Sequence, residues 1–566
     1  MLWNNKFELA ESTLKKKASS HPRYSLHHAE TIFLRSFITA DVNDTEQALA
    51  RLKDTREMAE TYIKYLDSNK LPPSSNLILK SKEDFKNSLL DCKIVLGDSL
   101  YMIAVLQLTR DYKFKGCFNM RRSWKTFEDA LSQVKDGHKY NEQLLECLHF
   151  GVGFFLYAMS IIPQKFLRLV EFVGFKADRE QGMQYIKHCG TNGGIRAPFA
   201  NMVLLFNNLL LPRGLYNPTK HLREAELVIQ DNMKRYPEGS LFQVMASHCY
   251  RKQCRIEEGL ACMVKALDNC ATFQRPPLIY SYELANCYVI MLDWPKAIEV
   301  FERLVKEESF QIRALCGLQL ASCYFACGLR SKGEEALSKV KSFAKRSSSV
   351  EPICVRQAAR YAQNGGYFSA FEIMYIRRDL AKMEKGNAER VLEALQQTAS
   401  KLSVLNPIPI PTTASSSGNS FFSKAWSFGQ SKKGSEATLS TCGSTSEMLN
   451  DRIAYMMMRG ATLKSMDRID EALTCFEEVV KLHPHAIEKF YYPYCLYEMS
   501  ESHFHRKNHE QTLEYLKRCN AISGYDWEDP LKIRLRVTMD QIKKDGASVG
   551  DDWGEEDLQS DSRSTQ

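Results

Sequence analysis

The stretch LIYSYELANCYVIMLDWPKAIEVFERL, Leu278 to Leu304, decides the fold. Apolar side chains recur in it every three or four residues on both sides of the turn MLDWPK (291–296), which predicts two amphipathic helices packed antiparallel. Ala297 follows Tyr288 by nine residues, and Phe301 follows Ala297 by four. The small Ala297 allows the helices to approach closely, and the large Phe301 fills the space beside it. The stretch therefore predicts a helical hairpin.

The same spacing of nine, four and then three residues recurs along the chain. Clear copies begin at Tyr250, Tyr324 and Leu463, a weaker copy begins at His503, and a half-copy ends at Pro237. The repeated positions are Tyr250, Gly259, Met263 and Ala266; Tyr324, Gly333, Leu337 and Val340; Leu463, Ala472, Phe476 and Val479; His503, Thr512, Leu516 and Cys519; and Ala225, Ile229, Met233 and Pro237. Because one hairpin cannot bury its own apolar face, the copies are expected to stack.

This pattern resembles the tetratricopeptide repeat, a pair of helices that stacks into a curved array. The copies at Tyr250, Tyr288 and Tyr324 follow one another after 38 and 36 residues. The typical repeat has about 34 residues, and longer turns between the helices would absorb the difference. An irregular helical bundle is the alternative. We expect an all-α, tetratricopeptide-repeat-like helical solenoid with a degenerate helical N-terminal half and a disordered insert.

The composition agrees with a large folded body in a reducing compartment. The 566 residues are 44% hydrophobic and 11% aromatic, which excludes a globally disordered chain. The seventeen cysteines are scattered singly and form no CxxC pair, so no secreted disulfide framework is indicated. The net charge is +8, and the acidic last sixteen residues carry −5, which leaves +13 for the rest. A basic body would suit acidic partners or an anionic membrane surface.

The N-terminal half has helical spacing without clean repeats. Helices are predicted over 27–40, 44–66, 81–108 and 123–134, with Asp44 as an N-cap. The expected divisions are a helical region over 1–145, an apolar junction over 146–240, repeats over 240–402, a disordered Pro/Ser/Thr-rich linker over 403–447, further repeats over 448–545 and an acidic disordered tail over 546–566. The linker and the tail contain too little apolar surface to fold alone.

A narrower resemblance appears in FGVGFFLYAMSIIPQKFLRLVEFVGFKADREQGMQYI, residues 150–186. Its apolar Gly-x-Gly helix, Pro163, the segment ending at Phe175 and the D-R-E-x-G motif (178–182) resemble the tetratricopeptide repeat protein 39 family. The resemblance implies a helical repeat fold and protein binding. Through related fungal inclusion body clearance proteins, it also implies association with the mitochondrial outer membrane, lipid handling or inclusion clearance. It implies no catalytic residues.

Candidate partner-binding residues follow from the repeat geometry, because the first helix of each pair lines the concave face of such arrays. They are Leu241, Val244, His248, Arg251, Lys252, Ile279, Tyr282, Asn286, Val289, Leu315, Leu318, Ser322 and Phe325. The surface that they predict is largely apolar, with one basic edge at Arg251 and Lys252, and suits an extended or helical segment with apolar anchors. Ordinary packing between repeats is the alternative for each residue.

Two stretches outside the repeats are candidate docking segments. FFSKAWSF in the linker offers Phe421, Phe422, Trp426 and Phe428 to a partner groove, to a membrane interface or to the chain itself. The acidic tail around Trp553 is interpreted as a docking peptide or as an internal occupant of the basic edge.

Motifs for catalysis are absent from the sequence. Gly151 and Gly153 lack the third glycine of a dinucleotide loop, and His505 and His509 share a helical face without a ligand set that completes a metal site. We predict no catalytic residue, cofactor, metal, nucleic-acid partner or small-molecule substrate. The expected function is a non-enzymatic cytoplasmic scaffold or adaptor that binds other proteins on its concave face. The alternatives are a peripheral membrane factor at mitochondria or lipid droplets and, third, a cryptic hydrolase or metalloenzyme.

Overall fold

The structure is a computed structural model of the 566-residue chain. It describes all residues except 40, 74, 76, 111, 162–177, 212–214, 216–218, 272, 274–276, 345–349, 407, 409–444 and 545–566. The described part consists of helices and connecting turns and contains no β-strand, which confirms the all-α prediction. It divides into two compact units, residues 1–387 with 527–566, and residues 388–526.

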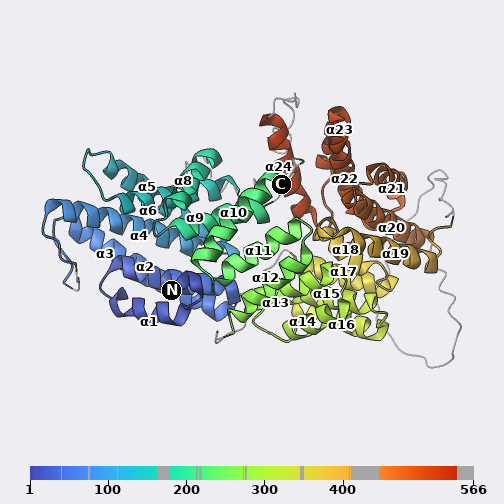
Figure 1. The fold of residues 1–566 in the computed structure, drawn as a ribbon, viewed down its shortest axis with the longest axis horizontal. Coiled ribbons are helices and arrows are strands. Elements are labelled where there is room, and N and C mark those ends of the chain that lie inside the picture. Colours follow the sequence, from blue (N-terminus) through green and yellow to red (C-terminus); the bar gives the residue numbers. More distant parts are fainter. Residues whose placement is uncertain are drawn as a thin grey trace, which may run out of the picture. The chain divides into compact units, whose positions relative to one another are not determined.

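The N-terminal part of the first unit is a series of helices packed against their chain neighbours (Figure 1). They are α1 (Phe7–Ala18), α2 (Pro22–Thr39), α3 (Val42–Leu66), α4 (Lys82–Thr109), α5 (Lys113–Val134), α6 (Glu142–Ser160), α8 (Arg179–Asn192) and α9 (Ala197–Leu205), followed by the short η2 (Phe206–Leu210). The four helices predicted here are present, but the predicted N-cap at Asp44 is wrong. Asp41 caps α3 instead, because its side chain accepts hydrogen bonds from the backbone N–H groups of Asn43 and Asp44.

Helical hairpins follow in both units. The first unit contains α10 (Thr219–Arg235), α11 (Ser240–Lys252), α12 (Ile256–Asp268), α13 (Leu278–Ile290), α14 (Trp294–Leu304), α15 (Arg313–Ala326), α16 (Arg330–Phe343), α17 (Glu351–Asn364), α18 (Ser369–Ile376), η3 (Leu380–Lys382) and the last helix, α24 (Glu528–Lys544). The second contains most of α19 (Lys385–Lys401), then α20 (Thr445–Ser465), α21 (Ile469–Leu482), η4 (His483–His485), α22 (Tyr491–His505) and α23 (His509–Asn520).

All five predicted repeat copies turn in the same way between their two helices. Four residues after each first repeat position, the backbone adopts a left-handed conformation, with φ between 58° and 73°, at Cys254, Leu292, Gly328, Asp467 and Lys507. The next residue donates its N–H to the carbonyl of the first position over 2.9–3.0 Å, as Asp293 does to Tyr288. This turn satisfies a carbonyl at the end of the first helix. The weak copy at His503 is therefore a repeat in the same sense as the other four.

The repeated positions form the seams of these hairpins. Ala297, Phe301 and Leu304 are at most 2% exposed, and the corresponding residues of the other four full copies are buried as well. The small residue is required by space: a Cβ atom at Gly333 would lie 2.5 Å from the ring of Phe325. The prediction that small residues mark the close approach of the two helices is thus confirmed at Gly333.

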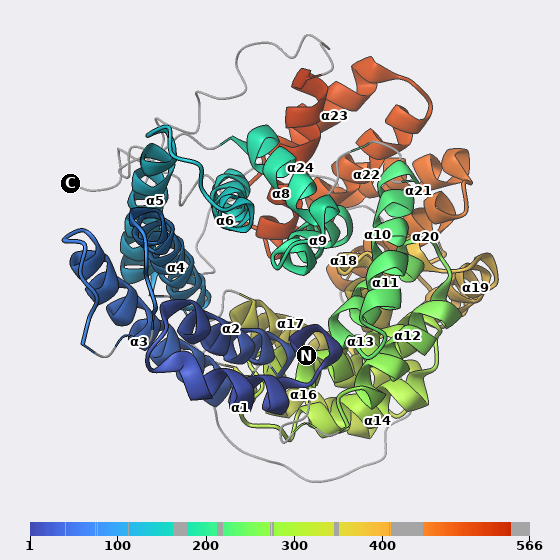
Figure 2. The same cartoon turned by 60° about the vertical axis from the view of Figure 1, so that its left-hand side comes forward.

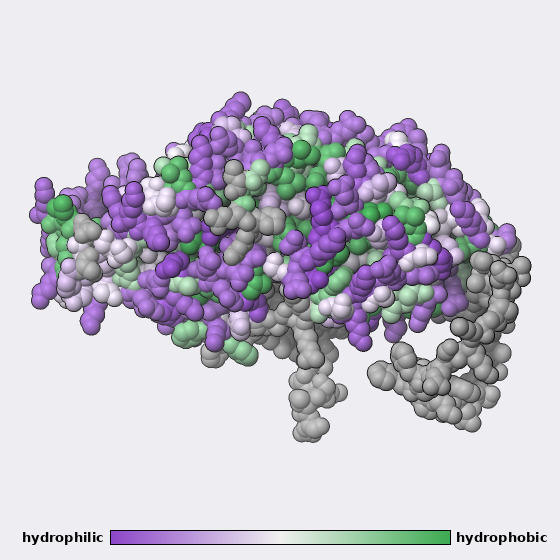
Figure 3. Space-filling view, turned by 90° about the horizontal axis from the view of Figure 1, so that it is seen from below, coloured by the Kyte–Doolittle hydropathy of each residue, from purple (hydrophilic) through white to green (hydrophobic). Residues whose placement is uncertain are grey.

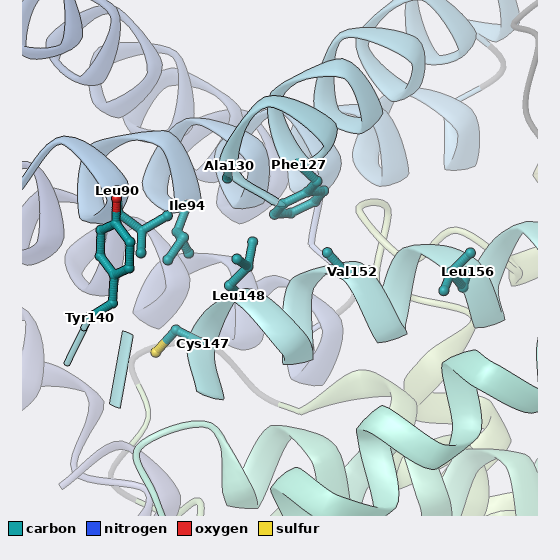
Figure 4. Packing of buried hydrophobic residues seen from close by; sticks show 9 residues of the cluster. All are labelled: Leu90, Ile94, Phe127, Ala130, Tyr140, Cys147, Leu148, Val152 and Leu156. Atoms are coloured by element: carbon teal, nitrogen blue, oxygen red, sulfur yellow. The ribbon is translucent and has the colours of Figure 1, made fainter. Parts of the chain in front are cut away.

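The two glycines of the apolar helix α6 serve contacts on opposite sides. A Cβ atom at Gly151 would lie 2.7 Å from the ring of Phe127. This ring belongs to α5 and points towards α6 in a core shared with α4, as Figure 4 shows. A Cβ atom at Gly153 would lie 2.6 Å from Cβ of Tyr185 in α8. The glycines therefore bring α6 close to its neighbours, as expected for a buried helix.

The N-terminal turn is fixed by residues far along the chain. Trp3 lies in η1 (Leu2–Asn4) and meets Phe199 edge to face at 4.8 Å between ring centroids, with Phe242 at 5.7 Å. Asn5 accepts a hydrogen bond from the Ser240 hydroxyl at 2.8 Å. Further along, α2 packs against α13, and Figure 2 shows the first helices beside the repeats. The chain's beginning is thus part of the repeat core.

Polar side chains cover most of the face seen in Figure 3, with apolar residues in small scattered patches. None of the described helices combines the length and apolar character needed to span a bilayer.

Candidate partner-binding face

The first helices of three successive repeats, α11, α13 and α15, are joined to one another by polar side chains. Ser240 in α11 lies 3.2 Å from the hydroxyl of Tyr280 in α13. Gln319 in α15 donates to the side-chain oxygen of Asn286 in α13 at 3.0 Å. These helices carry the thirteen predicted groove residues, and we call their shared surface the first-helix face.

The structure leaves none of the thirteen predicted residues fully exposed. Seven are buried: Val244, Arg251, Tyr282, Asn286, Val289, Leu318 and Ser322. Six are partly buried: Leu241, His248, Lys252, Ile279, Leu315 and Phe325. Arg251 is only 2% exposed and does not form an open basic edge. Most of this face is therefore an internal surface.

A later segment of the same chain covers part of the first-helix face. Residues 369–375 of α18 are all buried, and α18 packs on α15. Directly after α18, Arg377 donates to the hydroxyl of Tyr282 in α13 at 2.6 Å. The short η3 then contacts α11. The segment thus crosses the three repeats in reverse chain order, the path that an extended ligand would take in an open groove.

The face and the segment each contain a group of paired charged side chains. Arg251 donates to the carboxylate of Glu283 at 2.8 Å and contacts Nδ1 of His248 at 2.7 Å. Arg377 and Lys382 donate to the two carboxylate oxygens of Asp379 at 2.9 and 2.8 Å. These buried charges are paired, which buried ions require because water no longer solvates them.

The pairing shifts the proton equilibria of the acids and of His248. Burial disfavours ionised Glu283, but the surrounding groups, with Arg251 first and then His248 and Arg377, together outweigh burial and lower the pKa of Glu283 to about 2. Burial and then Arg251 lower the pKa of His248 to about 3, although Glu283 opposes them. For Asp379, burial acts against ionisation, and Arg377 and Lys382 prevail and lower the pKa. At neutral pH the cluster contains charged carboxylates and an uncharged imidazole.

The described residues offer little reactive chemistry elsewhere. They contain no group of three or more His, Cys, Asp or Glu side chains placed to hold a metal ion. Burial raises the pKa of Cys262 to about 11 and that of Cys354 to about 12, so both are thiols at neutral pH and weak nucleophiles.

Sequence reasoning missed the segment that covers the face. Arg377, Asp379 and Lys382 belong to no repeat position, and the spacing argument did not single them out. The available signal was the apolar run of α18, which follows Gly365 and Gly366 and has no partner helix directly after it. The predicted docking aromatics Phe421, Phe422, Trp426 and Phe428, and the tail around Trp553, lie outside the described residues.

Comparison with known proteins decides the family. The model of the Iml2/Tetratricopeptide repeat protein 39 family matches residues 1–407. The chain belongs to this family. A curated relative, tetratricopeptide repeat protein ttc-39B of Caenorhabditis elegans, is 22% identical to this chain. The alignment covers 95% of this chain and 90% of the relative. The family predicted from residues 150–186 is thereby confirmed.

Similarity to solved structures is weak. The human IFIT1 dimer with m7Gppp-AAAA gives a TM-score of 0.33 at 13% identity, covering 84% of this family member and 94% of the IFIT1 chain. Yeast Tom70 gives a TM-score of 0.25 at 12% identity, and the match covers 89% of this chain and 98% of the Tom70 chain. Scores of this size carry no argument about ligands or partners.

Proposed function

We propose that this family member is a non-enzymatic scaffold that binds a segment of another protein on its first-helix face. The proposal is carried by one apolar row. Leu241, Ile279 and Leu315 lie nine residues before Tyr250, Tyr288 and Tyr324, and so occupy equivalent positions in three successive first helices. All three are partly buried. We call them the aliphatic row.

The aliphatic row suits a partner segment with apolar side chains at regular intervals. Three equivalent aliphatic residues on stacked helices form a repeating contact surface, and repeat proteins bind extended segments on surfaces of this kind. The α18–η3 segment contributes Arg377 and Lys382, which share the single carboxylate of Asp379, so this group carries one net positive charge next to the row's helices. Acidic residues flanking the partner's apolar anchors would therefore add electrostatic attraction.

Affinity capture with the full-length chain tests the proposal. The variant Ile279→Lys/Leu315→Lys places two positive charges in the aliphatic row. The control Leu227→Lys places one on α10, where Leu227 is 61% exposed. We expect Ile279→Lys/Leu315→Lys to capture at least about tenfold less of each partner protein than the wild type and Leu227→Lys do. Equal capture by all three chains, with unchanged melting temperatures, would show that partners bind elsewhere.

The alternative of a peripheral membrane factor rests on the basic body of the chain and on residues 421–428, and the latter lie outside the described residues. The mapped geometry around the aliphatic row favours a polypeptide partner.

A further inference from the structure

The start of α5 exposes large aromatic side chains to solvent. Phe114 is 81% exposed and Phe118 is 64% exposed, and they lie four residues apart on one side of the helix. Tyr112, directly before the helix, is 53% exposed. We call Tyr112, Phe114, Lys115 and Phe118 the α5 aromatic corner. Aromatic side chains left in water at this density typically mark an interaction surface.

Positive charge accompanies the α5 aromatic corner. Lys115 is exposed and places its ammonium 5.9 Å from the ring centroid of Tyr112. From Lys113 to Phe127 the sequence contains five basic residues and no acidic one. One of these, Arg122, is paired with Glu60 of α3. The corner therefore favours an occupant that combines aromatic or apolar anchors with negative charge.

The chain's own C-terminal segment has this chemistry. Residues 545–566 contain seven acidic residues and one arginine, and the stretch DDWGEEDL (551–558) flanks Trp553 and Leu558 with carboxylates. An aromatic and an aliphatic anchor surrounded by acids complement both properties of the corner. The basic edge at Arg251, the other candidate site for the tail, is not accessible, because Arg251 is buried and paired with Glu283.

The described part of the chain holds α24 near α5, on the side of that helix that packs on α6. In α24, Arg536 donates to the backbone carbonyl of Ser160, the last residue of α6, at 3.4 Å. One residue earlier, Met159 packs in the same core cluster as Met120 of α5, two residues beyond Phe118. The helix α24 is thus held beside the end of α6 that faces the start of α5.

The reach of the segment follows from its length. Lys544 ends α24 eight residues after Arg536, which is about 12 Å along a helix. The nine residues from 545 to 553 reach up to about 30 Å when extended. Trp553 can therefore meet a surface within that distance of Lys544.

We infer that residues 551–558 dock on the α5 aromatic corner of the same chain. Trp553 and Leu558 cover Phe114 and Phe118, and the neighbouring carboxylates face Lys115 and the other cations of α5. The corner is then available to an external partner only when that partner displaces the tail by competition.

Zero-length crosslinking of the full-length chain tests the inference. A carbodiimide joins a lysine amine to a carboxylate that touches it, and mass spectrometry locates the joined residues. We expect the tail acids to couple mainly to Lys115 in about 50 mM salt, and at least fivefold less in about 500 mM salt, because exposed charges are screened. In Phe114→Ser/Phe118→Ser the yield should fall about tenfold, as for lost aromatic anchors.

Two controls keep the outcome interpretable. Leu227→Ser removes an equally exposed apolar side chain from α10 and should leave the crosslinks unchanged, and melting temperatures report whether any variant is misfolded. Tail crosslinks spread evenly over exposed lysines such as Lys332 and Lys339, or insensitive to Phe114→Ser/Phe118→Ser, would overturn the inference. So would corner-dependent binding of the full-length chain to phosphatidylserine vesicles without any tail crosslink, because the occupant would then be a lipid surface.

Discussion

His248 shows how one residue's surroundings set its chemistry in this chain. It lies in α11, partly buried, with Arg251 at hydrogen-bonding distance. Burial and this neighbouring cation both disfavour the imidazolium, so the side chain stays neutral well below the pH at which a free histidine takes up a proton. Glu283 responds to the same arginine in the opposite sense and stays ionised.

His248 should make stability depend on pH between about 6.5 and 4.5. The unfolded chain binds a proton near its ordinary pKa of 6.5, whereas the folded pKa is about 3, so stability is present above 6.5 and is lost as pH falls. Glu283 adds its own loss only below about 4.5, where the unfolded glutamate becomes protonated. The His248→Gln variant should lose up to about 2 kcal/mol less than the wild type between pH 6.5 and 5.

Melting temperatures across that range would measure the effect. His188→Gln, which changes an exposed histidine in α8, is the matched control and should follow the wild-type curve. Identical pH profiles for wild type and His248→Gln would show that His248 titrates normally.

At the scale of elements, α6 and α8 are in backbone contact. A Cβ atom at Gly182 would lie 2.8 Å from the carbonyl oxygen of Gly153 and 2.8 Å from the backbone nitrogen of Tyr157. No side-chain rotation can relieve contacts with backbone atoms. The glycine of the D-R-E-x-G motif is therefore needed for the distance between two helices, and requires no ligand to explain it.

Replacing Gly182 by alanine should push these helices apart. We expect Gly182→Ala to cost about 1–3 kcal/mol, as overpacking of a tight core does. Gly386→Ala, at an exposed helical site with no atom within 4 Å of the new Cβ, should be neutral or stabilising by up to about 1 kcal/mol. Denaturant melts followed by circular dichroism would compare the two, and equal midpoints would contradict the close approach of α6 and α8.

The elements also show which features sequence can predict. The repeat seams were predictable because spacing along one hairpin encodes its own packing, as for Ala297 and Phe301. The covering of the first-helix face by α18 was not, because it depends on a return path of the chain that leaves no periodic mark. Helix ends near Asp44 were off by a few residues, since Asp41 and Asp44 are equally good capping residues in sequence.

At the scale of the molecule, stacked hairpins should unfold locally. Phe476 is fully buried in α21 against the site of Gly460, and Phe476→Ala should cost about 3–5 kcal/mol. In repeat arrays such losses act mainly on nearest neighbours. Hydrogen exchange should therefore rise in α20 to α22 and stay unchanged in α11 to α14.

Phe301 occupies the same repeat position as Phe476, so substituting it gives the reciprocal experiment. Phe301→Ala, in α14 and also fully buried, should raise exchange in α13 to α15 and leave α20 to α22 as in the wild type. Uniformly faster exchange in both variants would mean that the whole chain opens as one cooperative body.

The anchoring of Trp3 has a consequence for synthesis of the chain. Its partner Phe242 leaves the ribosome roughly 12–50 s after it, at ordinary translation rates of about 5–20 residues per second. Until then the indole has no native pocket and is available to chaperones. The turn that contains Trp3 thus settles long after it is made, and a ribosome stalled before Phe242 would hold a nascent protein in which this turn cannot pack.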